Sequence, residues 1–125
     1  MKDKLIPEII KRKSSFNFSN EKILNDEIQI LIEATKWAPS SRNMQPWRVI
    51  FVSNESESYN ALFNSLRESN QEWAKNCTLF AVFCVNDDKG LNKKFLDVGY
   101  AGQNLMLQSE RLEIETHPIG GWHED

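Results

Sequence analysis

The sequence has few of the residues from which the commonest catalytic and metal sites are built. It contains two cysteines, which do not form a C-x-x-C pair, and two histidines, His117 and His123. Their spacing fits no strong zinc pattern, so we expect no metal site. The glycine patterns G-x-G-x-x-G and G-x-x-x-x-G-K-[ST] are absent, and so is the G-x-S-x-G motif of many hydrolases. The common dinucleotide, P-loop and nucleophile-elbow signatures therefore do not apply.

Long apolar runs and an excess of positive charge are missing as well. No apolar run approaches the ~20 residues of a membrane-spanning helix, and the N-terminus has no signal-peptide core. The net charge of −3 and the pI of about 5.4 make the chain a poor binder of polyanions, so we expect no nucleic-acid partner and no membrane. Both cysteines lie in or beside an apolar stretch, which indicates reduced thiols in a cytoplasmic protein.

The pattern of apolar residues predicts alternating helices and strands within one domain, residues 1–125. Helical spacing recurs in residues 3–13, 26–38, 56–69 and 95–112. Almost wholly apolar segments typical of buried strands occupy residues 47–53 and 78–85. Residues 114–121 form a short extended segment, and polar loops are predicted over residues 14–20, 39–46 and 86–92. Trp37, Trp47 and Phe51 are interpreted as core residues rather than as rings that stack on a ligand.

The two predicted strands are too few for a stable sheet of their own. We therefore expect further strands to come from a partner chain or from residues that the sequence does not contain. The almost wholly apolar second strand indicates a sheet covered by helices on both faces.

Four polar segments beside these elements are candidates for ligand binding. Residues 1–15 carry five basic and two acidic side chains, so Arg12 to Ser14 either hold a phosphate or belong to a solvated helix surface. The loop Pro39 to Pro46 offers donors and acceptors to a planar heterocycle, or is an ordinary surface loop. Asn70 to Trp73 is the third segment. In the fourth, His117 to Gly121, two glycines allow a ligand to approach the backbone.

Five segments resemble motifs of the nitroreductase family and occur in the same order. The family's opening motif, R-R-S-x-R-x-F, is similar to KRKSSFNFS, although Phe16 stands where the motif has its last arginine. A helix ending in W-A-P-S, followed by N-x-Q-P-W and a strand, is similar to EATKWAPSSRNMQPWRVIFV. NQEWAKNCTLFAVF resembles the family segment that contains an asparagine at the edge of the flavin. DVGYAGQNLMLQSERL resembles the family's dimer helix, and HPIGGW resembles the loop that lies over the flavin.

The resemblance implies a nitroreductase-like α+β fold, in which a mixed central sheet is flanked by helices in a three-layer sandwich. The fold would be incomplete at the C-terminus, because family members continue well beyond the last motif. The resemblance also implies a homodimer with FMN at its interface. The implied cofactor-binding residues are Arg12, Lys13, Ser14, Pro39, Ser40, Ser41, Asn43, Gln45, Asn70, Pro118, Ile119, Gly120 and Gly121.

The activity implied by the resemblance is transfer of reducing equivalents from NADH or NADPH through FMN to a small acceptor, such as a nitroaromatic or a quinone, by a ping-pong mechanism. No side chain is expected to act as a general acid or base, and Asn70 would give electrostatic support to the reduced ring. Two alternatives remain open, which are a flavin- or nucleotide-binding module without turnover and a truncated fragment without activity.

Overall fold

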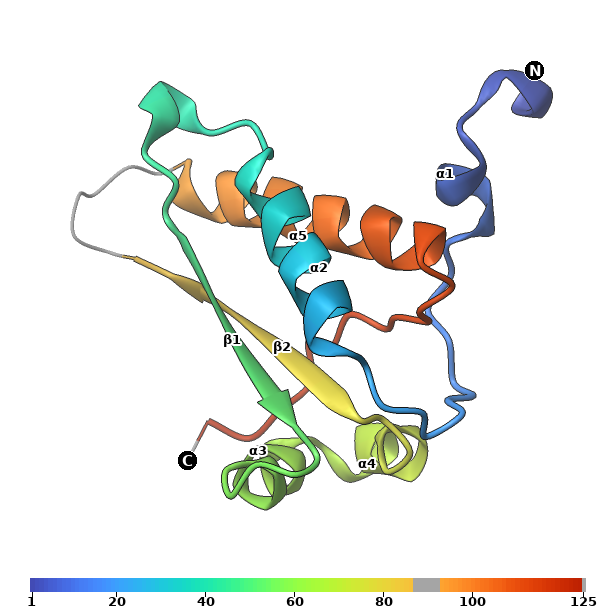
Figure 1. Cartoon of the computed structure of the whole chain (residues 1–125). Helices are drawn as coiled ribbons and strands as arrows, with labels where there is room; N and C mark the ends of the chain where they lie inside the picture. Colours follow the sequence, from blue (N-terminus) through green and yellow to red (C-terminus); the bar gives the residue numbers. More distant parts are fainter. Residues whose placement is uncertain (87–92, 125) are drawn as a thin grey trace.

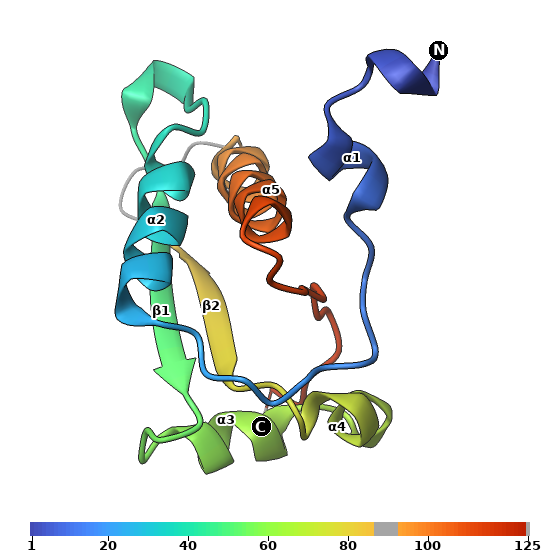
Figure 2. The same ribbon diagram turned by 45° about the vertical axis from the view of Figure 1, so that its right-hand side comes forward.

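The computed structural model describes residues 1–86 and 93–124, in which a two-stranded sheet carries helices on both faces. Helix α5 (Lys94–Arg111) lies against the sheet and helix α2 (Asn25–Lys36) lies against α5 (Figures 1 and 2). Helices α3 (Tyr59–Ser65) and α4 (Glu68–Ala74) lie together at one end of the strands. The predicted loop over residues 86–92 lies, apart from Asn86, outside the described residues.

The strands β1 (Trp47–Ser53) and β2 (Leu79–Val85) pair in antiparallel register, from Trp47 opposite Val85 to Ser53 opposite Leu79. Side chains alternate between the two faces of a sheet. Trp47 packs with Ala38 and Ala101 on the α5 side, whereas Val52 packs with Phe80 against α3 and α4 on the other. The α+β prediction is confirmed. The mixed sheet is not formed by the described residues, because two antiparallel strands cannot make one.

The second face of the sheet is covered at one end only. The buried cluster there contains Val52, Phe80, Leu66 and Ala74, all near the α3–α4 end of the strands. Ile50, which lies on the same face nearer the other end, keeps 54% of its surface exposed. The described residues therefore supply only part of the outer layer that a three-layer sandwich requires.

The predicted N-terminal helix over residues 3–13 is wrong in its extent. A 3-10 turn, η1 (Lys2–Lys4), is followed by extended residues Leu5 and Ile6, and only then by helix α1 (Pro7–Lys11). Proline has no backbone N–H and disfavours helical geometry in the residue before it. Pro7 therefore starts α1 at its first position instead of lying within a longer helix.

The predicted helix over residues 56–69 is two helices, separated by extended residues Leu66 and Arg67. No proline or glycine causes the break. Leu66 is 5% exposed in the core and forms an isolated antiparallel bridge with Trp122, while the Arg67 N–H donates to the carbonyl of Gly121 at 3.2 Å. Pairing with a segment far along the chain thus overrides local helical preference, and it places Asn70 in the first turn of α4.

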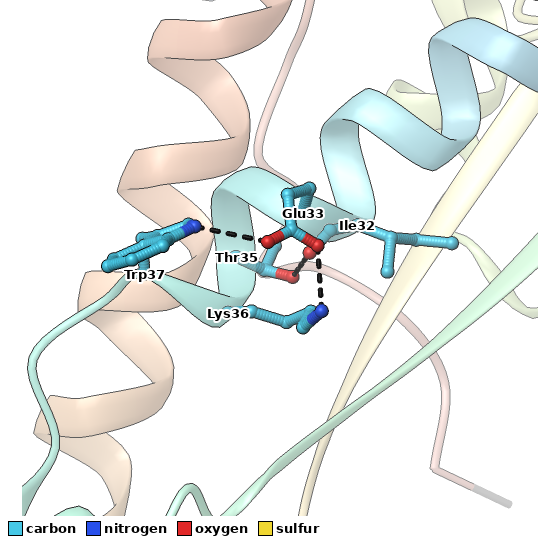
Figure 3. Close-up of polar contacts among 5 residues, drawn as sticks. All are labelled: Ile32, Glu33, Thr35, Lys36 and Trp37. Carbon is cyan, nitrogen blue, oxygen red and sulfur yellow. Dashed lines mark hydrogen bonds and ion pairs between the residues drawn. The ribbon is translucent and has the colours of Figure 1, made fainter.

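Trp37 is exposed by 79%, so its assignment to the core is wrong, whereas Trp47 is buried as predicted. Helix α2 ends at Lys36, and the residues buried at this end of the helix are Thr35 and Ala38. The indole Nε1 of Trp37 donates to Glu33 Oε1 at 3.1 Å, and the same carboxylate pairs with Lys36 (Figure 3). Trp37 is therefore an exposed ring whose orientation is fixed by the helix that precedes it.

Helix α5 begins at Lys94 and ends at Arg111, close to the predicted bounds. Its buried positions recur every four residues, at Asp97, Ala101, Leu105 and Ser109. Within the part of the chain that the structure describes, no helix is long and apolar enough to cross a membrane.

We expect Leu66→Ala to lower the free energy of unfolding by about 2–5 kcal/mol, because the variant leaves a cavity where α3, α4 and β1 meet. Leu24→Ala is the matched control, since Leu24 is 61% exposed, and it should change the stability by less than about 0.5 kcal/mol. Urea denaturation followed by circular dichroism measures both. Equal effects of the two variants would contradict the central position of Leu66.

Candidate functional site

The structure divides the predicted site residues into two groups. Residues 12–14 pair through Ser14 with Thr116 in the segment that follows α5, and Asn70 is bonded to Gly121 further along that segment. Residues 12–14, Asn70 and residues 118–121 are called the C-end group below. Residues 39–45 lie beside the N-terminal end of α5 and are called the N-end loop (Figures 1 and 2). No hydrogen bond joins the two groups within residues 1–86 and 93–124.

Backbone pairing of two distant segments builds one side of the C-end group. Ser14 forms an isolated parallel bridge with Thr116, and the Ser15 N–H donates to the Thr116 carbonyl at 3.1 Å. The His117 ring donates from Nδ1 to the Ser15 carbonyl at 2.8 Å, because a carbonyl can only accept. The segment Arg12 to Ser14 is thereby fixed next to the chain that leads into Pro118.

The cations of this segment have no ionic partner in the described structure. Arg12 is half-buried and Lys13 is exposed, and neither belongs to any of the ion pairs formed by the described residues. The neighbouring Glu8 is occupied by Arg111 at 3.6 Å. Two unpaired cations beside the exposed Ser14 are a donor set suited to a phosphate.

Asn70 holds the opposite side of the C-end group through Gly121. Its Nδ2 donates to the Gly121 carbonyl at 2.9 Å, which leaves Oδ1 as an acceptor without a partner in the described residues. A Cβ on Gly121 would lie 2.9 Å from Asn70 Nδ2 and 3.3 Å from Arg67 Cδ, whereas a Cβ on Gly120 would meet nothing within 4 Å. Gly121 is thus packed tightly, while Gly120 borders open space that a ligand can enter.

An aromatic cluster joins the two sides of the C-end group. The rings of Trp73 and His117 stack with centroids 4.0 Å apart, and Phe16 meets both edge-on. Phe18 stacks on Trp73 at 5.9 Å. From the sequence, Phe16 is recognised only as a missing cation and Trp73 only as the end of a candidate binding segment, because these contacts join residues far apart along the chain.

The N-end loop is held by a carboxylate that the sequence analysis did not select. Asp97 Oδ2 accepts from Ser40 Oγ at 3.0 Å and from the Ser41 N–H at 2.9 Å. The Gln45 N–H donates to Ser40 Oγ at 2.8 Å. The sequence does contain a sign of this role, because Asp97 is the one charged residue among the buried positions that recur every four residues along α5.

The two groups lie too far apart to share one small ligand within a single chain. Helix α5 has 18 residues between them, which corresponds to a length of about 27 Å at the rise of an α-helix. A single chain therefore does not bring the predicted N-end loop residues to the C-end group, namely Pro39, Ser40, Ser41, Asn43 and Gln45.

Two further features lie outside both groups. A pocket of about 210 Å³ between the start of α2 and the β1–β2 end contains no predicted site residue, and its polar members include Lys22, Glu55 and Thr78. Burial raises the pKa of the Cys77 thiol to about 11, and burial with the nearby thiol raises the pKa of Tyr59. Cys77 therefore carries little thiolate at neutral pH and is unsuited to act as a nucleophile.

Comparison with protein families gives a match to the model of the nitroreductase family over residues 9–80. No curated protein matches the sequence significantly. Among solved structures, an oxidoreductase containing FMN superposes with a TM-score of 0.86 at 27% identity, over 94% of this chain and 64% of its own. A candidate NADH dehydrogenase/NAD(P)H nitroreductase from Parabacteroides distasonis gives a TM-score of 0.73 at 30% identity, over 84% of this chain and 61% of its own.

A nitroreductase family protein from Clostridium novyi shares the fold, with a TM-score of 0.82 at 22% identity over 94% of this chain and 69% of its own. The chain thus spans somewhat less than two thirds of the length of the first two structures.

We expect Gly121→Ala to lower the free energy of unfolding by about 1 kcal/mol, because the added methyl group displaces the Asn70 amide from its hydrogen bond. Gly120→Ala is the control, since its Cβ would meet no atom within 4 Å, and it should have a smaller effect. Thermal and urea denaturation compare the two. A more destabilising Gly120→Ala would contradict this account of the loop.

Proposed function

Because the chain belongs to the nitroreductase family, we propose that it is an FMN-dependent oxidoreductase that takes electrons from NADH or NADPH and passes them to a small acceptor, such as a nitroaromatic or a quinone. The observation that carries the proposal is the C-end group, in which unpaired cations, a serine, an asparagine and a glycine-containing loop are fixed together. The relatives support the choice of cofactor, since one contains FMN and another is named for NAD(P)H.

The residues of the C-end group fit the chemistry of FMN. Arg12, Lys13 and Ser14 supply charge and a hydroxyl for a phosphate. Asn70 Oδ1 is an acceptor for an imide N–H, and its amide nitrogen fixes the loop of residues 118–121. The space beside Gly120 allows the backbone of Pro118, Ile119 and Gly120 to approach a flat ring.

The protein's own part in the proposed mechanism is to bind, orient and support the charge of the cofactor. FMN, when bound, supplies the redox chemistry. Arg12 and Lys13 would offset the charge of the phosphate, while the aromatic cluster holds Phe16, Trp73 and His117 together. Asn70 would support charge at the edge of the ring with its second Nδ2 hydrogen, because the first is donated to the Gly121 carbonyl and Oδ1 can only accept.

We further propose that the functional unit is a homodimer formed through α5. The exposed side of this helix presents Phe95, Leu96, Gly99, Tyr100 and Gln103. Phe95 is 67% and Leu96 55% exposed, and a Cβ on Gly99 would meet nothing within 4 Å. An apolar stripe with a central glycine allows a second helix to approach closely. Two copies of α5 crossing in opposite directions about a two-fold axis would bring the N-end loop of one protomer to its partner's C-end group.

The cofactor proposal predicts that the protein quenches FMN fluorescence on titration, and that NADH bleaches the visible absorbance of the bound flavin without oxygen. Arg12→Gln should weaken FMN binding by about 10- to 100-fold, since hydrogen bonds to charged groups contribute ~1.5–3 kcal/mol. Lys4→Gln removes an exposed cation outside both groups and serves as the control.

The outcomes of that experiment separate the alternatives. Retained flavin that NADH does not bleach would support a binding module and would overturn the proposed oxidoreductase. Equal affinity of Arg12→Gln and Lys4→Gln for FMN would remove Arg12 from the site. Asn70→Ala should slow the reduction of bound flavin, and an unchanged rate would contradict its electrostatic role.

The dimer proposal predicts that Gly99→Arg weakens self-association by about 100-fold, equivalent to ~3 kcal/mol. The protomer has room for the side chain at this position, so its fold should persist. Ser69→Arg, at an exposed position of α4, is the control. Sedimentation equilibrium measures both, and an unchanged dimer in Gly99→Arg would overturn the α5 interface.

A further inference from the structure

Asp97 is a buried carboxylate to which the proposed mechanism gives no role. It is 4% exposed in the first turn of α5 and belongs to none of the ion pairs found in residues 1–86 and 93–124. A buried charge without a cation is costly unless hydrogen bonds stabilise it. Those of Asp97 come from Ser40 Oγ and from the backbone of Ser41. The carboxylate therefore depends on the N-end loop, and the loop depends on the carboxylate.

The N-end loop is strained and needs such support. Arg42, Asn43 and Gln45 have φ values of 53°, 54° and 47°, in the left-handed region that side-chain-bearing residues rarely adopt. All three are exposed, so burial of their side chains does not hold them in place. Strained backbone persists only where surrounding contacts over-determine it, and it concentrates at ligand-binding sites.

The hydroxyl of Ser40 is the centre of the contacts that hold this loop. It has a single hydrogen, which it donates to Asp97, and it accepts from the Gln45 N–H. Ser40 therefore closes the loop from Ser40 to Gln45 onto α5. It has no hydrogen left to donate to a cofactor, so in this conformation Ser40 links the loop to α5.

We infer that Asp97 is a positioning residue, which acts through Ser40 to hold the N-end loop in the strained conformation that the cofactor site requires. The inference rests on the proposed function, in which this loop completes the site of the partner protomer. It assigns ligand contact in the loop to residues other than Ser40. The experiment therefore measures the loop and the cofactor separately.

Limited trypsin digestion of the full chain reports on the loop, because Arg42 is an exposed cleavage site within it. The rate of cleavage after Arg42, divided by the rate after the exposed Lys75 in the same digest, removes the effect of global unfolding. The ratio should rise at least about fivefold in Ser40→Ala, which removes both hydrogen bonds of the hydroxyl. It should rise as much in Asp97→Asn, because neutral hydrogen bonds are weaker than those to a carboxylate. Ser40→Thr should keep the cleavage ratio at the wild-type value, since threonine retains the hydroxyl and the extended backbone at Ser40 accepts a β-branched residue.

Matched controls exist for both substitutions. Asp26→Asn makes the same chemical change in the first turn of α2, and Ser58→Ala removes a hydroxyl that caps no helix. Both should leave the cleavage ratio at the wild-type value. FMN titration of the same variants, by fluorescence quenching, should show about tenfold weaker binding in Ser40→Ala and recovery in Ser40→Thr.

The results decide the inference in either direction. An unchanged cleavage ratio in Ser40→Ala would overturn the inference. If Asp97→Asn does not fold, the two Ser40 variants are sufficient to test it. Unchanged FMN affinity in a variant whose loop is released would also overturn it. If the wild-type protein binds no FMN, the proposed oxidoreductase fails, while the cleavage ratio still shows whether Asp97 holds the loop.

Discussion

The packing of α5 against the sheet and against α2 is the interaction on which both halves of the candidate site depend. The helix uses small or compact residues on its buried side, including Ala101 and Ser109, each 0% exposed. Close contact of this kind leaves no room for the helix to shift. The N-end loop is bonded to its first turn, and the segment that follows its last turn leads into the C-end group. The length of one helix therefore sets the separation of the two groups.

A separation of this size keeps the two groups from sharing one small ligand within the described residues of a single chain. Each group is organised internally, the N-end loop by Asp97 and the C-end group by Asn70 and the Ser14–Thr116 bridge. Neither group approaches the other around α5. The proposed assembly of two chains would join the two groups without any movement within a chain.

The sequence predicted the strands, α2 and α5 well, because their apolar periodicity arises from the residues themselves. It failed where distant segments decide the structure. The break at Leu66 depends on pairing with Trp122, and the exposure of Trp37 depends on which residues meet α5. The family motifs located the polar segments of the site, but periodicity and motifs do not show that Ser40 is bonded to Asp97 or that Trp73 stacks on His117. Such contacts become visible only when the chain is folded.

The pairing of Ser14 with Thr116 has a consequence for the order of assembly. The hydrogen bond between Ser15 and His117 joins residues 102 positions apart, and such long-range contacts carry a large loop-closure cost. The basic segment Arg12 to Ser14 is therefore held beside the segment after α5 only once the chain between these two segments has been brought together.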